Sequence, residues 1–166
     1  MSQFTGSPAT GTGGATCDGI IQALELGAGG WSALHDDTTG NVEQGAVRLQ
    51  VDLTTSAASL FNVLGRSYLS IDLTSLTGVT VVDASLTITG FSKTNNFAET
   101  PSMYLVQSSF ASAGTLASTD FPNIGSVSFG NITYAEFNTS GANAITLNAA
   151  GLTYLGTILG SIAKLG

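Results

Sequence analysis

Charged side chains are scarce in this sequence, and positively charged ones are the scarcest. Charged residues make up 9% of the 166 residues, against about 25% in an average soluble domain. Four Lys and Arg stand against eleven Asp and Glu, which gives a formal net charge of −7. Affinity for nucleic acid comes mainly from clustered cations, so this composition argues against a nucleic-acid partner. Hydrophobic residues reach 43%, and such an apolar chain with so little charge favours an assembled protein.

Three further absences narrow the classes of protein. The single cysteine, Cys17, cannot form a disulfide within the chain. The single histidine cannot supply the several imidazoles that zinc enzymes use. No apolar run reaches the ~18 residues of a membrane-spanning helix, and residues 1–8 lack the basic and apolar regions of a secretion signal. We therefore expect no membrane partner and no export by a signal peptide.

Polar and apolar side chains alternate with a period of two along several short segments, which is typical of half-buried antiparallel strands. Clusters of Thr, Ser, Asn and Gly separate these segments at the spacing found in sandwiches. The pattern predicts strands over residues 20–24, 31–34, 46–53, 66–73, 81–89, 103–107, 126–132 and 143–147. The core expected between two sheets consists of Val47, Leu49, Val51, Leu69, Ile71, Val82, Leu86 and Ile88.

The two ends of the chain differ from this pattern. Near the C-terminus, Asn148 is a good helix cap, and we expect a short helix over residues 149–155 that ends at Gly156 and leads into a buried strand. Residues 1–17 are rich in Gly, Ser, Thr and Ala and show almost no apolar periodicity, which favours a flexible or partner-docked arm. The prediction is one β-sandwich domain over residues 18–166, preceded by an arm whose assembly contacts come from Ser2, Gln3, Phe4, Pro8 and Cys17.

Five short segments together resemble a known type of domain. They are Asp18-Gly19, residues 31–36, residues 66–73, Ala84-Ser85-Leu86 and residues 148–152. Similar segments occur in the jelly-roll domain of bacteriophage virion structural proteins, which is distantly similar to DNRLRE-type carbohydrate-binding modules. The resemblance implies an all-β fold, a jelly-roll-like antiparallel β-sandwich with an extended N-terminal arm.

The same resemblance implies two alternative functions. The first is a non-enzymatic virion structural protein, in the role of a capsid decoration, head-fibre or tail-associated protein. Its partners would be further copies of itself in a homo-oligomer and other virion proteins. A Met1 start followed directly by a low-complexity arm favours this stand-alone role. The alternative is a secreted or surface carbohydrate-binding module, extracellular and with glycans as partners.

Few residues are candidates for a binding site. Trp31 lies beside polar loop residues and, with His35, is the candidate for a glycan contact, although a tryptophan buried in the core or between the sheets is the simpler interpretation. Asp36, Asp37 and Glu43 form the densest acidic group and could bind calcium together with loop carbonyls. A solvated turn explains the same acidic residues, and their spacing is not that of an EF-hand loop.

No catalytic pattern stands out from the sequence. A Ser-His-Asp triad can be assembled from His35 only because serines are abundant, and no Gly-x-Ser-x-Gly motif accompanies it. The acidic residues are scattered and define no specific pair for glycoside hydrolysis. We therefore expect a protein that is not an enzyme and that has no cofactor, apart from the calcium candidate.

Overall fold

The computed structural model describes residues 18–44, 50–57 and 60–166. In chain order, the elements are β1 (Asp18–Gly29), α1 (Trp31–His35), β2 (Asn41–Gln44), β3 (Asp52–Ala57), β4 (Leu60–Asp72), β5 (Ser85–Thr89), β6 (Ser102–Ser108), a 3-10 turn (Ser118–Asp120), β7 (Ile124–Thr133), β8 (Ala142–Thr146), α2 (Ala149–Ile158) and β9 (Ile162–Leu165). All strand pairs are antiparallel. The predicted all-β fold is confirmed.

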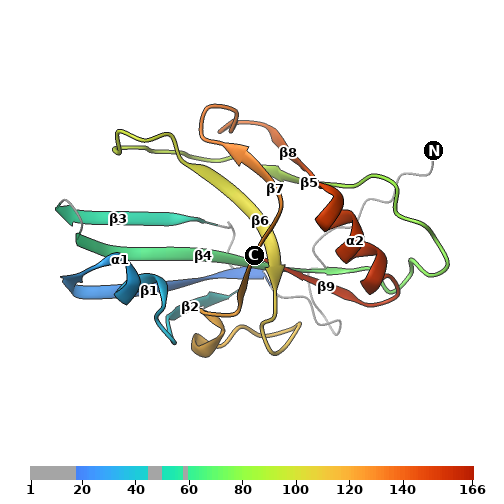
Figure 1. The fold of residues 1–166 in the computed structure, drawn as a ribbon, viewed down its shortest axis with the longest axis horizontal. Coiled ribbons are helices and arrows are strands. Elements are labelled where there is room, and N and C mark those ends of the chain that lie inside the picture. Colours follow the sequence, from blue (N-terminus) through green and yellow to red (C-terminus); the bar gives the residue numbers. More distant parts are fainter. Residues whose placement is uncertain (1–17, 45–49, 58–59) are drawn as a thin grey trace.

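The strands form two layers (Figure 1). The larger sheet has the order β2-β1-β4-β9-β6-β7, and β3 also pairs with β4. β3 and β9 share one edge of the long strand β4: β3 pairs along its first half and β9 along residues 69–72. The smaller layer is a ribbon of β5 and β8, which packs together with α2 against the β6, β7 and β9 side of the large sheet.

Two hydrophobic clusters lie on opposite faces of β4, because alternate residues of a strand point to opposite faces. The first cluster is covered by α1 and by residues 109–123, which we call the strap. It consists of Ile21, Ala23, Leu34, Leu64, Tyr68, Phe110, Leu116 and Phe121. The second lies under the ribbon and α2 and consists of Leu69, Leu105, Phe129, Ile132, Ile145, Leu147 and Leu165.

The strap has little regular structure and is held by buried polar groups. The carboxylate of Asp120, 1% exposed, accepts hydrogen bonds from the backbone N–H groups of Ala111 and Ala117 and from the Asn123 amide. The Phe121 carbonyl accepts two further bonds of 2.8 Å, from Arg66 Nη1 and from the Tyr68 hydroxyl. These bonds fix the strap on the sheet and satisfy groups whose burial would otherwise be costly.

All three basic side chains in the described ranges bind backbone carbonyls beside an aromatic ring. Arg66 also donates to His35 O, and its Cζ lies 4.2 Å from the centre of the Phe121 ring. Lys93 donates to Tyr134 O and Phe137 O. Lys164 donates to Phe110 O and Ala111 O, and so joins β9 to the strap. These three side chains therefore hold loops against the two layers.

The predicted C-terminal helix is confirmed. The Asn148 side chain accepts a hydrogen bond from Gly151 N at 3.1 Å, the expected N-cap contact. The helix continues past Gly156 to Ile158, and β9 follows as the predicted buried strand between β4 and β6.

The prediction for residues 31–34 is wrong, because they belong to a helix rather than a strand. The helix turns Leu34 completely into the first cluster and leaves Trp31 at the surface. Two predicted core residues are also exposed: Val51 precedes β3 and is 55% exposed, and Val82 precedes β5 and is 78% exposed. Leu69, Ile71 and Leu86 do join the second cluster, whereas Val47 and Leu49 lie outside the described residues.

The buried phenol of Tyr68 leads to a testable pH dependence. Burial raises its pKa from 10.0 to about 12, although the Arg66 cation acts in the opposite direction. Between these two pH values the unfolded chain loses this proton first, so the free energy of unfolding falls as the pH rises. We expect a loss on the order of 2 kcal/mol over this interval, absent in Tyr68→Phe. Urea unfolding across the alkaline range measures it, and identical pH profiles for the two proteins would contradict it.

Candidate functional site

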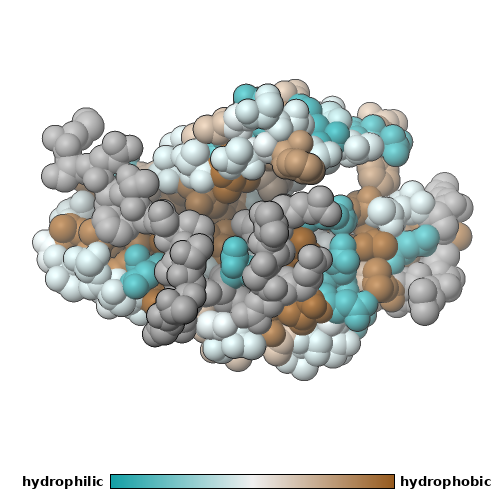
Figure 2. All heavy atoms as spheres, turned by 180° about the vertical axis from the view of Figure 1, so that it is seen from behind, coloured by the Kyte–Doolittle hydropathy of each residue, from teal (hydrophilic) through white to brown (hydrophobic). Residues whose placement is uncertain are grey.

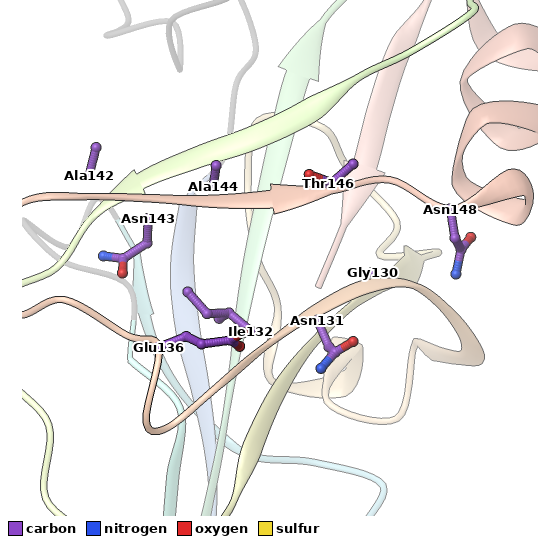
Figure 3. A pocket seen from close by; sticks show the side chains of 9 residues that line it. All are labelled: Gly130, Asn131, Ile132, Glu136, Ala142, Asn143, Ala144, Thr146 and Asn148. Atoms are coloured by element: carbon purple, nitrogen blue, oxygen red, sulfur yellow. The ribbon is translucent and has the colours of Figure 1, made fainter.

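The candidate site is a groove between the outer edges of β7 and β8, with a volume of about 460 Å³. β7 is the end strand of the large sheet, and in the described ranges β8 pairs only with β5. Figure 3 shows the groove from close by, with Ala142, Ala144 and Thr146 projecting from one face of β8 and Asn143 from the other. Its lining residues are Gly130, Asn131, Ile132, Glu136, Ala142, Asn143, Ala144, Thr146 and Asn148.

On one side of the groove, backbone groups of β8 point away from the ribbon. Leu147 N donates to Ala84 O, and Gly90 N donates to Gly141 O, both at 2.9 Å. In an antiparallel pair, only alternate residues bond to the partner strand. The odd-numbered residues 141–147 therefore face β5. The N–H and C=O groups of Ala142, Ala144 and Thr146 face the groove.

On the other side, most of the outward groups of β7 are already bonded. Phe129 O accepts from Asn148 N at 2.7 Å. Tyr134 N donates to Pro101 O, toward β6, which places the backbone groups of Thr133 and Asn131 on the outer edge. Thr133 N donates to the Glu136 carboxylate at 3.1 Å. The backbone of Asn131 is left facing the groove.

The two strands converge at Gly130. A Cβ atom there would lie 2.5 Å from Thr146 O and 2.9 Å from Ile145 Cγ2, so only glycine fits without movement. The bond between Asn148 and Phe129 closes this end of the groove. The groove therefore narrows toward α2 and widens toward Glu136 and Ala142.

Two polar side chains of the groove serve the fold. Asn143, 3% exposed, donates to Asn138 O and accepts from Asn138 N, which fixes the loop between β7 and β8. Asn148 caps α2 and also donates to Ser128 O. Their hydrogen-bonding atoms are thus committed to the chain itself.

Glu136 is the charged residue of the groove lining. Hydrogen bonds from the Thr133 hydroxyl and from its backbone N–H lower the pKa of this carboxyl. A general acid needs its pKa raised toward the working pH, and the shift here is in the opposite direction. The groove presents unpaired strand backbone and one carboxylate, an arrangement suited to binding an extended chain and not to proton transfer.

The glycan candidates Trp31 and His35 lie together on α1, which lies beside β1 and β4 and away from β7 and β8 (Figure 1). Trp31 is 44% exposed. Its ring centre lies 5.0 Å from that of His35 and 5.4 Å from that of Phe61. His35 Nδ1 lies 2.6 Å from the carboxylate of Asp36. This is a small aromatic surface that is half open to solvent.

The structure describes the side chains of two of the three calcium candidates, Asp36 and Asp37. Asp36 contacts His35, and Asp37 accepts from Thr39 N at 3.2 Å, as an Asx turn does. Glu43 lies on β2 opposite Ile20, and its side chain is outside the described part of the chain. Among the described residues, no three His, Cys, Asp or Glu side chains are grouped closely enough to hold a metal ion. The arm residues Ser2, Gln3, Phe4, Pro8 and Cys17 also lie outside the described ranges.

No family model, curated protein sequence or solved structure matches this chain. Within the described ranges, no helix is long and apolar enough to cross a membrane. The site must therefore be interpreted from its own geometry.

The close approach at Gly130 predicts a stability difference between two glycines. Gly130→Ala should lower the free energy of unfolding by about 1–3 kcal/mol, because the added methyl group meets the Thr146 carbonyl. Gly156→Ala is the matched control: it lies within α2 with nothing within 4 Å of the added Cβ, and should raise stability by about 0.5–1 kcal/mol. Urea unfolding measures both, and equal stability of Gly130→Ala and wild type would contradict the geometry.

Proposed function

We propose that this protein is a non-enzymatic structural protein that acts by self-assembly and docking. The proposal is carried mainly by the number of large apolar side chains left exposed on a chain with little charge. They are Leu24, Trp31, Val42, Val51, Leu60, Val79, Val82, Phe91, Phe97, Tyr104 and Val127. Burying a side chain of this size in an interface contributes about 1.5–3 kcal/mol.

These residues lie in more than one area. Val79, Val82, Phe91 and Phe97 belong to the connections on either side of β5, with Val82 78% and Phe91 74% exposed. Tyr104 and Val127 lie on β6 and β7. Figure 2 shows apolar surface in several separate areas of one face. Separate apolar areas suit a subunit that contacts several neighbours.

The charge distribution supports association through apolar contacts. Because Arg66, Lys93 and Lys164 are bound to carbonyls, acidic side chains such as Asp83 and Glu99 dominate the exposed charge in the described ranges. Copies of such a surface repel one another at low ionic strength, and salt screens this repulsion. Apolar contacts are not weakened by the same screening, so association should strengthen as salt is added.

This salt dependence is tested by sedimentation of the full chain. We expect oligomers at micromolar concentration, with a larger fraction assembled at moderate than at low salt. Phe91→Ser should weaken association about tenfold, equivalent to ~1.4 kcal/mol, because it removes one of the most exposed apolar side chains. Thr94→Ala, an exposed neighbour in the same connection, is the control. A stable monomer at all salt concentrations would overturn the proposal.

The setting that we propose for this assembly is a phage-like particle, in which the protein is a decoration, head-fibre or tail-associated component. The support is the resemblance of five short segments of the sequence to virion jelly-roll domains. Phage-like particles are purified on a density gradient from a culture that releases them. Mass spectrometry of these particles should find the protein in fixed stoichiometry with the other particle proteins. Its absence from particles, together with retention on immobilised polysaccharide that Trp31→Ala abolishes, would favour the carbohydrate-binding alternative instead.

A further inference from the structure

The groove has the features of an unoccupied strand position. Ala142, Ala144 and Thr146 on β8, and Asn131 on β7, direct backbone N–H and C=O groups into the same space. Unpaired edges of this kind bind extended peptides by adding a strand to a sheet. None of the lining residues is aromatic, so the groove lacks a surface on which a sugar ring could stack. An extended peptide is the ligand class that fits.

The chain contains a segment suited to this position. Residues 9–16 read Ala-Thr-Gly-Thr-Gly-Gly-Ala-Thr. In an extended conformation, Ala9, Gly11, Gly13 and Ala15 share one face, and the threonines share the other. The face formed by alanine and glycine is small enough for the narrow part of the groove, where Gly130 lies close to Thr146. Threonine, on the other face, is a residue that favours strands. The whole segment of residues 1–17 carries no Asp, Glu, Lys or Arg, so it meets the Glu136 carboxylate without repulsion.

We propose that residues 9–16 of a second copy of this chain enter the groove as an added strand between β7 and β8. This inference rests on the self-assembly proposed above and identifies the contact through which two copies associate. The added strand would bond to Ala142 and Ala144 on one side and to Asn131 on the other. It would also join the ribbon to the large sheet.

The position of β1 argues for a second copy as the donor. Along the large sheet, Asp18 lies in one row with Leu69, Leu165 and Gln107. β4, β9 and β6 separate β1 from β7, which is four strand spacings or about 19 Å. Only Cys17 connects residues 9–16 to Asp18, and two residue steps span at most about 7 Å. The segment therefore cannot lie in the groove of its own chain.

The strand directions support the same donor. Four successive antiparallel pairings make β1 and β7 parallel. The row of paired residues that contains Asp18 crosses β7 between residues 124 and 128. The groove, at residues 130–133 of β7, lies further along the direction in which both β1 and β7 run. The chain enters β1 from the opposite direction. A donor from another copy is free of this constraint.

A proline on each edge of the ribbon tests the groove. Ala144→Pro removes an N–H that faces the groove and no bond of the ribbon itself. Thr87→Pro is the matched control, because Thr87 is the direct partner of Ala144 and its N–H faces the other edge of the ribbon. Sedimentation of the full chain should show association about tenfold weaker for Ala144→Pro. Thr87→Pro should associate as wild type does.

Disulfide trapping tests the donor without relying on a proline variant. In a Cys17→Ser background, one purified protein carries Thr12→Cys and the other carries Ala144→Cys, with Thr87→Cys as the control for the second. Under mild oxidation, the heterodimer of Thr12→Cys with Ala144→Cys should be trapped much faster than the heterodimer of Thr12→Cys with Thr87→Cys. Equal rates would overturn the inference, as would a preferred internal disulfide in one chain that carries both Thr12→Cys and Ala144→Cys.

The two proposals fail in distinguishable ways. If the wild-type chain is a monomer at all salt concentrations, the self-assembly fails and this contact fails with it. If the wild-type chain assembles, but Ala144→Pro assembles equally well and trapping shows no preference, the self-assembly stands. In that case the groove is not its contact.

Discussion

The hydrogen bonds that converge on the Phe121 carbonyl hold one face of this protein together. Arg66 and Tyr68 extend from β4 and donate to the same oxygen, while Arg66 also reaches the last carbonyl of α1, that of His35. A buried guanidinium is costly when unpaired, and here two carbonyls and the Phe121 ring compensate it. Through these contacts, α1 and the strap cover Ile21, Ala23 and Leu64. Without them the first cluster would be open to water.

The long strand β4 supports both layers because each of its faces is buried over part of its length. Tyr68 belongs to the strap side, and its neighbour Leu69 belongs to the ribbon side. In such a strand the polar positions of the alternation are not all exposed: Ser70 is buried beside the strap and bonds to the Ala113 carbonyl. The two sides are closed differently: the ribbon and α2 cover one, whereas the short helix α1 and the irregular strap, which depends on Asp120, cover the other.

Local patterns predicted the second half of the chain well. β6, β7 and β8 follow alternation confined to a few residues, and α2 begins where Asn148 caps it. Residues 31–35 could not be predicted in this way, because a five-residue helix has no period to detect and is held by the burial of Leu34 and the bond from Arg66 to His35. Val82 alternates in register with Leu86, but β5 begins only at Ser85. The groove between β7 and β8 cannot be predicted from local patterns, because its edges depend on strand order, which a single sequence does not contain.

The position of β9 has a consequence for how the chain acquires its structure during synthesis. Residues 162–165 form the strand that joins β4 to β6 in the large sheet. The two groups of strands on either side of it are made earlier, yet no strand pairing connects them in the described ranges until β9 is inserted. A ribosome that has reached β8 therefore carries two incomplete sheets with open inner edges. Closure requires contacts of high sequence separation, which form slowly, and until then the nascent chain depends on protection of those edges from other chains.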